Sequence, residues 1–121
     1  MRLFFAIISN MTTIKNIVVA GGTHGNERTG VALVQKWMEN PGCYNTLCPS
    51  ANVQLVYGNP EAMRLNRRYR DHDLNRAFSQ VCLDSTADVD QYEFRRAREL
   101  NKLFGPKGAN AKTDLLLDVH N

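Results

Sequence analysis

Short apolar runs alternate with longer amphipathic stretches along the 121-residue chain. Residues 14–20, 53–57 and 114–119 are nearly continuous apolar runs rich in valine, isoleucine or leucine, a pattern typical of buried strands. Residues 27–40 and 92–104 carry apolar side chains at the spacing of one helix face. Strands that alternate with helices predict an α/β fold with a mainly parallel sheet and flanking helices.

Glycine and proline mark where these predicted elements end. Gly21-Gly22 closes the first apolar run, Gly58-Asn59-Pro60 closes the second, and Gly105-Pro106 stops the helix predicted over residues 92–104. Residues 61–90 lack a clear periodicity and contain an arginine-rich stretch. In open parallel sheets, ligands collect beyond the carboxyl ends of the strands, so the residues that follow the apolar runs are candidates for a site.

The length allows one compact domain and excludes a second full one. With 43% hydrophobic and 22% charged residues, the composition is that of an ordinary globular protein. We expect residues 14–121 to form this unit, and residues 1–13 to be a leader or an extra strand, with Met11 as an alternative start. No apolar run approaches the length that spans a bilayer, so we expect no membrane partner.

The net charge limits which binding partners are expected, and the cysteine content indicates the redox state of the cellular compartment. The formal net charge of +3 is modest and its charges are interspersed, which does not indicate nucleic acid or anionic lipid as a partner. The three cysteines are an odd number without CxxC spacing, so they build neither a disulfide framework nor a four-cysteine zinc site. We expect a reducing, cytoplasmic location.

Two histidines follow the ends of predicted strands and form the first indication of chemistry. His24 and Glu27 stand three positions apart after the glycine pair, and His120 follows the last strand. Two imidazoles and one carboxylate, with a fourth position left to water, are a ligand set typical of catalytic zinc. The HxxE spacing by itself is a weak signal, and the alternative is that His24 only hydrogen-bonds to the backbone.

Asp118 lies two positions before His120, so the two side chains share one face of an extended strand. A carboxylate there can accept the second ring proton of a ligand histidine and set its tautomer. The alternative is a solvated aspartate at the end of a strand.

Five motifs in order carry a resemblance to a known family: GGTHGNERTG (residues 21–30), GNP (58–60), RRYRDHDLNRAF (67–78), YEFRRARELNKLFGPK (92–107) and LLLDVHN (115–121). Together they resemble the aspartoacylase and aminoacylase-3 branch of the zinc carboxypeptidase superfamily. The resemblance implies a zinc carboxypeptidase-like fold, of which residues 14–121 would be the amino-terminal part of the catalytic domain. It also implies that His24, Glu27 and His120 bind one Zn²⁺ ion.

The arginine-rich stretch is the most basic part of the chain and fits a small acidic substrate better than nucleic acid, because it lacks a known nucleic-acid motif. The resemblance implies that Asn75 and Arg76 hold the α-carboxylate of the substrate and that Arg68 stabilises the oxyanion. His72 stands between two aspartates, which suggests a second metal site. We disfavour that site because the resemblance assigns no ligand there and aspartates are common in loops.

The reaction implied by the resemblance is hydrolysis of the amide bond of an N-acyl-L-amino acid, either N-acetyl-aspartate or an N-acetyl aromatic amino acid. The family's general-base glutamate would lie beyond Asn121, and nothing in the sequence aims the remaining glutamates at the site: Glu39, Glu61, Glu93 and Glu99. We therefore expect a truncated chain that can assemble the metal ligands, has low or no activity alone, and ends in an exposed edge strand.

Three other functions remain open at this point. A carboxypeptidase-like peptidase would show similar ligands and a similar oxyanion arginine. A catalytically dead zinc-binding or interaction module would pair with a related subunit through its open edge. A nucleic-acid binder is the weakest alternative. We expect a small-molecule N-acyl amino acid as the partner of the site, and the resemblance also implies a homo-oligomer.

Overall fold

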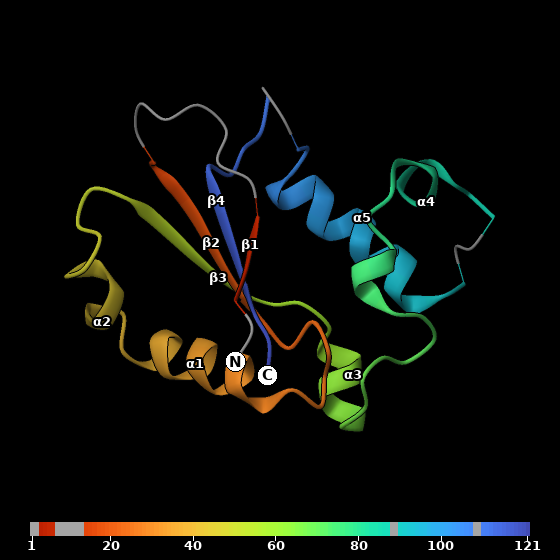
Figure 1. The fold of residues 1–121 in the computed structure, drawn as a ribbon, viewed down its shortest axis with the longest axis horizontal. Helices are drawn as coiled ribbons and strands as arrows, with labels where there is room; N and C mark the ends of the chain where they lie inside the picture. The colour runs from red at the N-terminus through yellow and green to blue at the C-terminus, as the bar shows by residue number, and fades with distance from the viewer. Residues whose placement is uncertain (1–2, 7–13, 88–89, 108–109) are drawn as a thin grey trace.

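The computed structural model describes residues 3–6, 14–87, 90–107 and 110–121, so Met11 lies outside the described residues. Its centre is a four-stranded sheet in the order β1-β4-β2-β3 (Figure 1). β2 is parallel to both of its neighbours, and β1 is antiparallel to β4. The mainly parallel sheet is therefore confirmed, with these bounds: β1 Leu3–Ala6, β2 Asn16–Gly21, β3 Asn52–Tyr57 and β4 Leu115–Val119.

The expectation that the last strand forms an exposed edge is wrong. β4 lies between β2 and β1, with Leu117 paired to Val19 on one side and to Phe5 on the other. Its backbone donors and acceptors are thus engaged by both neighbours, which removes the free edge that an interaction module would use there. β4 is nevertheless only half-buried, and not a fully buried strand as its apolar run predicts.

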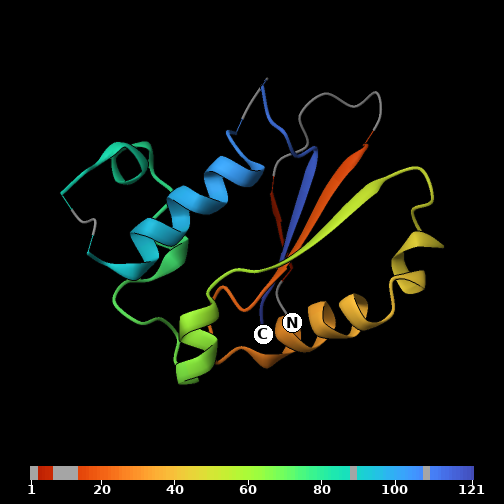
Figure 2. The same cartoon turned by 180° about the vertical axis from the view of Figure 1, so that it is seen from behind.

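The two long helices agree with the predicted ones within a residue at each end. α1 covers Arg28–Glu39, and α5 covers Tyr92–Phe104. Val31 and Val34 are buried on the face of α1 that meets the strands. In both views α1 lies on one side of the strands, and α5 with its short neighbour α4 lies on the other (Figures 1 and 2).

Residues 61–90 contain short helices that periodicity does not reveal, because each has two turns or fewer. Side chains cap three of them: Asn59 accepts from Ala62 N–H, Asp73 from Asn75 N–H and Ser79 from Cys82 N–H. Together with α2 after the first long helix, the short elements are α2 Gly42–Asn45, α3 Pro60–Leu65, the 3₁₀ helix η1 Leu74–Arg76 and α4 Gln80–Asp84.

The apolar core has a part on each side of the sheet. One part joins the buried Val19 of β2 to α1, because Val19 shares a face of the strand with Gly21, whose Cα approaches Gly30 of α1. The other is a cluster that η1 and α5 share: Leu74, Ala77, Phe94, Ala97 and Leu100. This second cluster fixes α5 against the segment that follows α3, which carries the arginine-rich motif.

The cysteines and the helix lengths complete the description. Cys43, Cys48 and Cys82 are free thiols, and Cys43 is exposed. Among the described residues, no helix has both the length and the apolar content needed to cross a bilayer.

Candidate active site

The loop after β2 turns sharply and places His24 and Glu27 side by side. Gly22 has a φ of 72°, in the left-handed region that favours glycine. A Cβ on Gly25 would collide with the backbone of Ala62, so only glycine fits where this loop passes α3. Glu27 N–H donates to the carbonyl of His24 over 3.1 Å, which closes a turn and brings the two side chains to one side.

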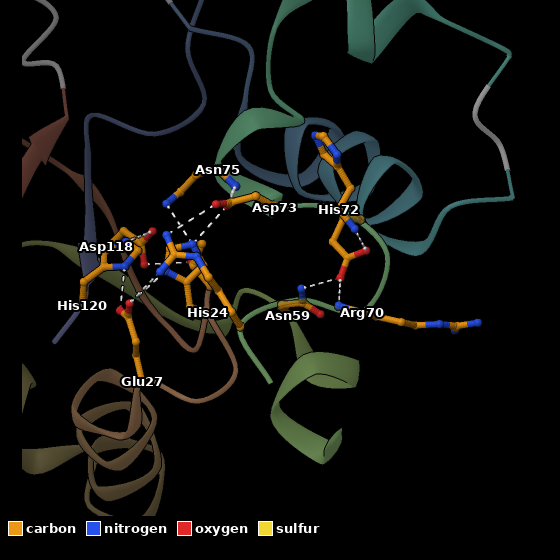
Figure 3. Close-up of polar contacts among 12 residues, drawn as sticks. His24, Glu27, Asn59, Arg70, His72, Asp73, Asn75, Asp118 and His120 are labelled. Carbon is orange, nitrogen blue, oxygen red and sulfur yellow. Dashed lines mark hydrogen bonds and ion pairs between the residues drawn. The ribbon is translucent and has the colours of Figure 1, made fainter. Parts of the chain in front are cut away.

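His120 reaches the same point from the end of β4, 93 positions away from Glu27 in the chain. The two oxygens of Glu27 lie 2.9 Å from Nδ1 of His24 and 2.9 Å from Nδ1 of His120. One ligand atom from each residue lies within 4.8 Å of the others. Figure 3 shows these three side chains converging. The structure therefore brings together the three residues that the sequence analysis selected as ligands.

The three residues are largely shielded from solvent, with 3% of the His24 side chain, 18% of Glu27 and 13% of His120 exposed. Burial works to raise the pKa of Glu27, but hydrogen bonds from His24, Asn121 N–H and His120 outweigh it and lower that pKa. The hydrogen bond to Asp118 is the main cause that raises the pKa of His120, against the opposing effect of burial. Glu27 is thus ionised at neutral pH.

Each imidazole also contacts a second carboxylate through its other ring nitrogen. Nε2 of His120 lies 2.8 Å from Asp118 Oδ2, and Nε2 of His24 lies 3.1 Å from Asp73 Oδ1. With a metal ion bound at Nδ1 in place of the hydrogen bonds to Glu27, each ring would hold its proton on Nε2 against the aspartate. Both rings are therefore oriented with Nδ1 toward Glu27.

This donor set fits a small divalent cation. A tetrahedral zinc ion with bonds of about 2.1 Å holds its ligand atoms about 3.4 Å apart, between the 2.9 Å contacts and the 4.8 Å limit seen here. Two nitrogen ligands, one carboxylate oxygen and two supporting carboxylates match a metal centre with a position left open for water.

The ligand group stands at one end of a cleft of about 640 Å³. Asn75 and Arg68 line the cleft beside His24, and the cleft continues along an apolar wall between the sheet and α5. That wall includes Ala20, Val56, Phe78, Leu100, Phe104 and Leu116. Leu116 and Asp118 lie on the face of β4 that lines the cleft, and His120 follows directly after the strand on the same side, so the cleft leaves this face of β4 partly exposed.

Of the three predicted substrate-contacting residues, Arg68 and Asn75 lie close to the ligands, whereas Arg76 lines a different cleft. Arg68 Nη1 lies 3.8 Å from Glu27 Oε1, and 54% of the Arg68 side chain is exposed, so the guanidinium is accessible to a ligand. Asn75 Nδ2 lies 3.5 Å from Nε2 of His24. Arg76 lines a neighbouring cleft of about 390 Å³ that it shares with Arg68. Arg68 thus stands between the two clefts.

Comparison with known proteins decides the family. The sequence profile of the Succinylglutamate desuccinylase/Aspartoacylase catalytic domain matches residues 13–121. The chain belongs to this family. It is 49% identical over 106 residues to the N-acyl-aromatic-L-amino acid amidohydrolase (carboxylate-forming) of Rattus norvegicus. The matched region covers 87% of this chain and 33% of that protein. It is 44% identical over 109 residues to the aspartoacylase of Mus musculus, which covers 89% and 34% respectively.

Solved structures show the same relationship. The crystal structure of murine aminoacylase 3 superposes with a TM-score of 0.82 at 45% identity, covering 93% of this chain and 37% of that one. The succinylglutamate desuccinylase of Chromobacterium violaceum, at 22% identity and a TM-score of 0.58, shows the shared fold alone. The chain spans about a third of the length of the relatives it matches.

Within this aspartoacylase-type fold, the structure shows two contributors that the sequence analysis did not select. Asp73 faces His24 from 49 positions away, and no spacing in the chain signals that contact. Burial works to raise the pKa of Asp73, but hydrogen bonds from His24 and Asn75 N–H lower it. Asn121 donates its N–H to Glu27 Oε2 over 3.1 Å and accepts from Thr29 N–H, so it links Glu27 to the first turn of α1.

The remaining histidine and glutamates have other partners. The ring of His72 stacks on Phe94 at 4.7 Å, outside the ligand group. Three of the four remaining glutamates pair with side chains of their own helices, away from the ligand group: Glu39 with Gln35, Glu61 with Arg64 and Glu99 with Arg96. Glu93 is buried, and both of its oxygens accept hydrogen bonds away from the ligands.

Proposed function

We propose that this chain carries the metal-binding part of a zinc-dependent amidohydrolase that cleaves the amide bond of N-acyl-L-amino acids. The observation that carries the proposal is the His24–Glu27–His120 group, in which each imidazole also contacts an aspartate. The names of the relatives support the reaction class, because they describe amidohydrolases of N-acyl-aromatic amino acids and an aspartoacylase. The chain is more similar to the N-acyl-aromatic amidohydrolase, at 49% identity, than to the aspartoacylase, at 44%. This difference and the apolar wall of the cleft favour an N-acyl aromatic substrate over N-acetyl-aspartate.

Each residue has a distinct part in the proposed reaction. His24, Glu27 and His120 would hold the zinc ion, which would supply polarisation of the acyl carbonyl and a bound water with a pKa lowered toward about 7. Arg68, half-exposed at the mouth of the cleft, donates hydrogen bonds to the oxygen on which negative charge develops. Asn75 and Arg76 bind the α-carboxylate of the substrate, Arg76 through its two parallel N–H groups.

The described glutamates provide no base that faces the ligand group other than Glu27 itself. The proposal therefore assigns the proton acceptor for the water to a glutamate that lies outside these residues. One zinc ion, a cytoplasmic location and a homo-oligomeric whole protein complete the proposal.

Two measurements test it. The first is equilibrium dialysis of the 121-residue chain with zinc, in which we expect one ion per chain and no uptake by His24→Ala. The second is hydrolysis by a chimera in which residues 14–121 precede the remaining part of the rat amidohydrolase, assayed on N-acetyl aromatic amino acids, N-acetyl-aspartate and a blocked dipeptide. Release of the amino acid from either N-acetyl substrate supports the proposal. Cleavage of the peptide alone, or no cleavage by a zinc-loaded chimera whose parent enzyme is active, refutes it.

A further inference from the structure

Glu93 is a fully buried carboxylate in the first turn of α5, with 0% of the residue exposed. Four N–H groups point at its two oxygens. Oε1 accepts from Asn59 Nδ2 at 2.9 Å and from Arg70 N–H at 2.6 Å. Oε2 accepts from Asp71 N–H at 2.9 Å and from His72 N–H at 3.1 Å. Three consecutive backbone N–H groups therefore surround one side chain.

A buried carboxylate is costly unless donors surround it, so this arrangement is built for a charge. Burial works to raise the pKa of Glu93, but the bonds from Asn59 and from the three backbone groups outweigh it and lower that pKa. Glu93 is therefore ionised at neutral pH, and an apolar residue of similar size would leave three part-buried backbone donors without their partner.

The bound segment is the one that joins two residues of the site. Arg70, Asp71 and His72 lie between Arg68 and Asp73 in the chain. Asp73 follows directly and places Oδ1 3.1 Å from Nε2 of His24. In Figure 3, Asn59, Arg70 and His72 lie together to one side of the metal ligands, and Asp73 lies between the two groups. Glu93 thus holds the segment from behind, one residue before Asp73.

Residues 92–94 and 70–72 contact each other in both directions. Asp71 Oδ2 accepts from Tyr92 N–H at 2.9 Å, which caps the start of α5. The His72 ring stacks on Phe94 at 4.7 Å with an interplanar angle of 21°. We call these two tripeptides the clamp. The hydrogen bonds and the ring contact of the clamp fix both the position and the orientation of residues 70–72 relative to α5.

Asn59 connects the clamp to the loop that carries His24. Its side chain donates to Glu93 and its Oδ1 accepts from Ala62 N–H. Its backbone N–H donates to the carbonyl of Gly22 at 3.0 Å, two residues before His24. Glu93 is therefore linked to both partners of the His24–Asp73 contact. It reaches the His24 loop through Asn59, and it reaches Asp73 through His72 N–H.

We propose that Glu93 is a positioning residue of this site: through the clamp it sets the place of Asp73 against His24. The inference rests on the proposed function, because it assigns Glu93 a role in holding a metal-binding histidine. A carboxylate that orients a ligand histidine typically contributes 10- to 100-fold to metal affinity. If the clamp is lost and Asp73 moves away from His24, we expect zinc affinity to fall by part of this roughly 10- to 100-fold contribution.

The test measures zinc affinity of the folded 121-residue chain by competition with a chromophoric chelator. Glu93→Gln keeps the shape of the side chain but turns an NH₂ group toward two N–H donors, which breaks two of the four bonds. Glu99→Gln is the matched control, because it removes an exposed carboxylate from the same helix. Asp71→Ala is a second variant, which removes the contact of the clamp with Tyr92 N–H at an exposed position. It takes the place of Glu93→Gln in the test if that variant does not fold.

We expect about a 10-fold rise in the zinc Kd for Glu93→Gln, a smaller rise for Asp71→Ala and none for Glu99→Gln. In a double-mutant cycle, Glu93→Gln adds nothing to Asp73→Ala, because Asp73→Ala already removes the contact through which Glu93 acts. A loss of thermal stability without a change in zinc Kd, or full additivity with Asp73→Ala, overturns the proposal. A wild-type chain that binds no zinc refutes the proposed function instead, so the two failures are distinguishable.

Discussion

Replacing Asp118 by asparagine removes one negative charge beside His120 with almost no change of shape. Asp118 accepts from His120 through Oδ2 at 2.8 Å and from Thr23 through Oδ1 at 2.9 Å. In the variant, the amide oxygen can still accept from His120, and the amide NH₂ can donate to the Thr23 hydroxyl. The variant therefore isolates the charge of the carboxylate from its geometry.

The expected magnitude follows from this contact. With the hydrogen bond kept, Asp118→Asn falls at the low end of the range for such carboxylates, about a 10-fold rise in zinc Kd, or ~1.4 kcal/mol. Asp118→Ala loses both contacts and leaves the mostly shielded His120 ring without orientation, so we expect about 100-fold. Asp73→Asn, on the other imidazole, should cost a similar factor, and the two losses should add because the aspartates contact different rings.

The assay is titration of the metal-free chain with zinc in the presence of a chelator of known affinity, at one pH for all variants. Asp84→Asn, an exposed carboxylate on α4, is the control for loss of net negative charge. Equal zinc affinity for wild type, Asp118→Asn and Asp118→Ala would refute the reasoning, since it would mean that Nε2 of His120 needs no partner.

Three further predictions follow from the described contacts. Arg68→Ala should lower kcat of the chimera about 10²–10³-fold at unchanged zinc content, because the guanidinium contacts the ligand carboxylate only at 3.8 Å; a parallel loss of zinc would contradict this. Gly25→Ala should lower the free energy of unfolding in urea by about 1–3 kcal/mol through its collision with Ala62, whereas Gly42→Ala, with open space around it, should be neutral or stabilising. The lowered pKa of Glu93 means that its contribution to stability is full above the unfolded-state pKa of about 4.5 and is lost as pH falls through the lower folded-state pKa. Thermal melts from pH 6 to pH 3 should therefore fall less steeply for Glu93→Gln than for wild type, and parallel curves would contradict this.

The elements with strong periodicity are predictable from the sequence alone. The helix expected over residues 27–40 is α1, and the one over residues 92–104 is α5, because each buries one face and ends at a helix-stopping residue. The short helices between Pro60 and Asp84 escape such prediction, since capping bonds and contacts with α5 stabilise them. Leu103 also fits the apolar face of α5 by spacing, yet 53% of it is exposed.

The candidate site divides in the same way. His24 and Glu27 are close in the chain, and His120 follows a parallel strand, so local spacing and the polarity of the sheet place all three at one edge of the sheet. The family resemblance is what assigned them as one ligand group. Asp73 and Glu93 are different, because each acts on a segment that only folding brings near. Glu93 lies 21 to 23 positions from the three backbone N–H groups that it accepts from, on a helix whose predicted role is to pack apolar side chains.

By itself, the sequence determined the parallel α/β order, the side of the sheet on which the ligands stand and the three residues that meet there. These features depend on period and chain direction, which are local properties. Only the tertiary structure decided that β1 covers the edge of β4, that Asp73 stands behind His24, and that a buried carboxylate holds the segment carrying this aspartate. Those outcomes depend on which distant donors and acceptors are left to satisfy one another once water is excluded.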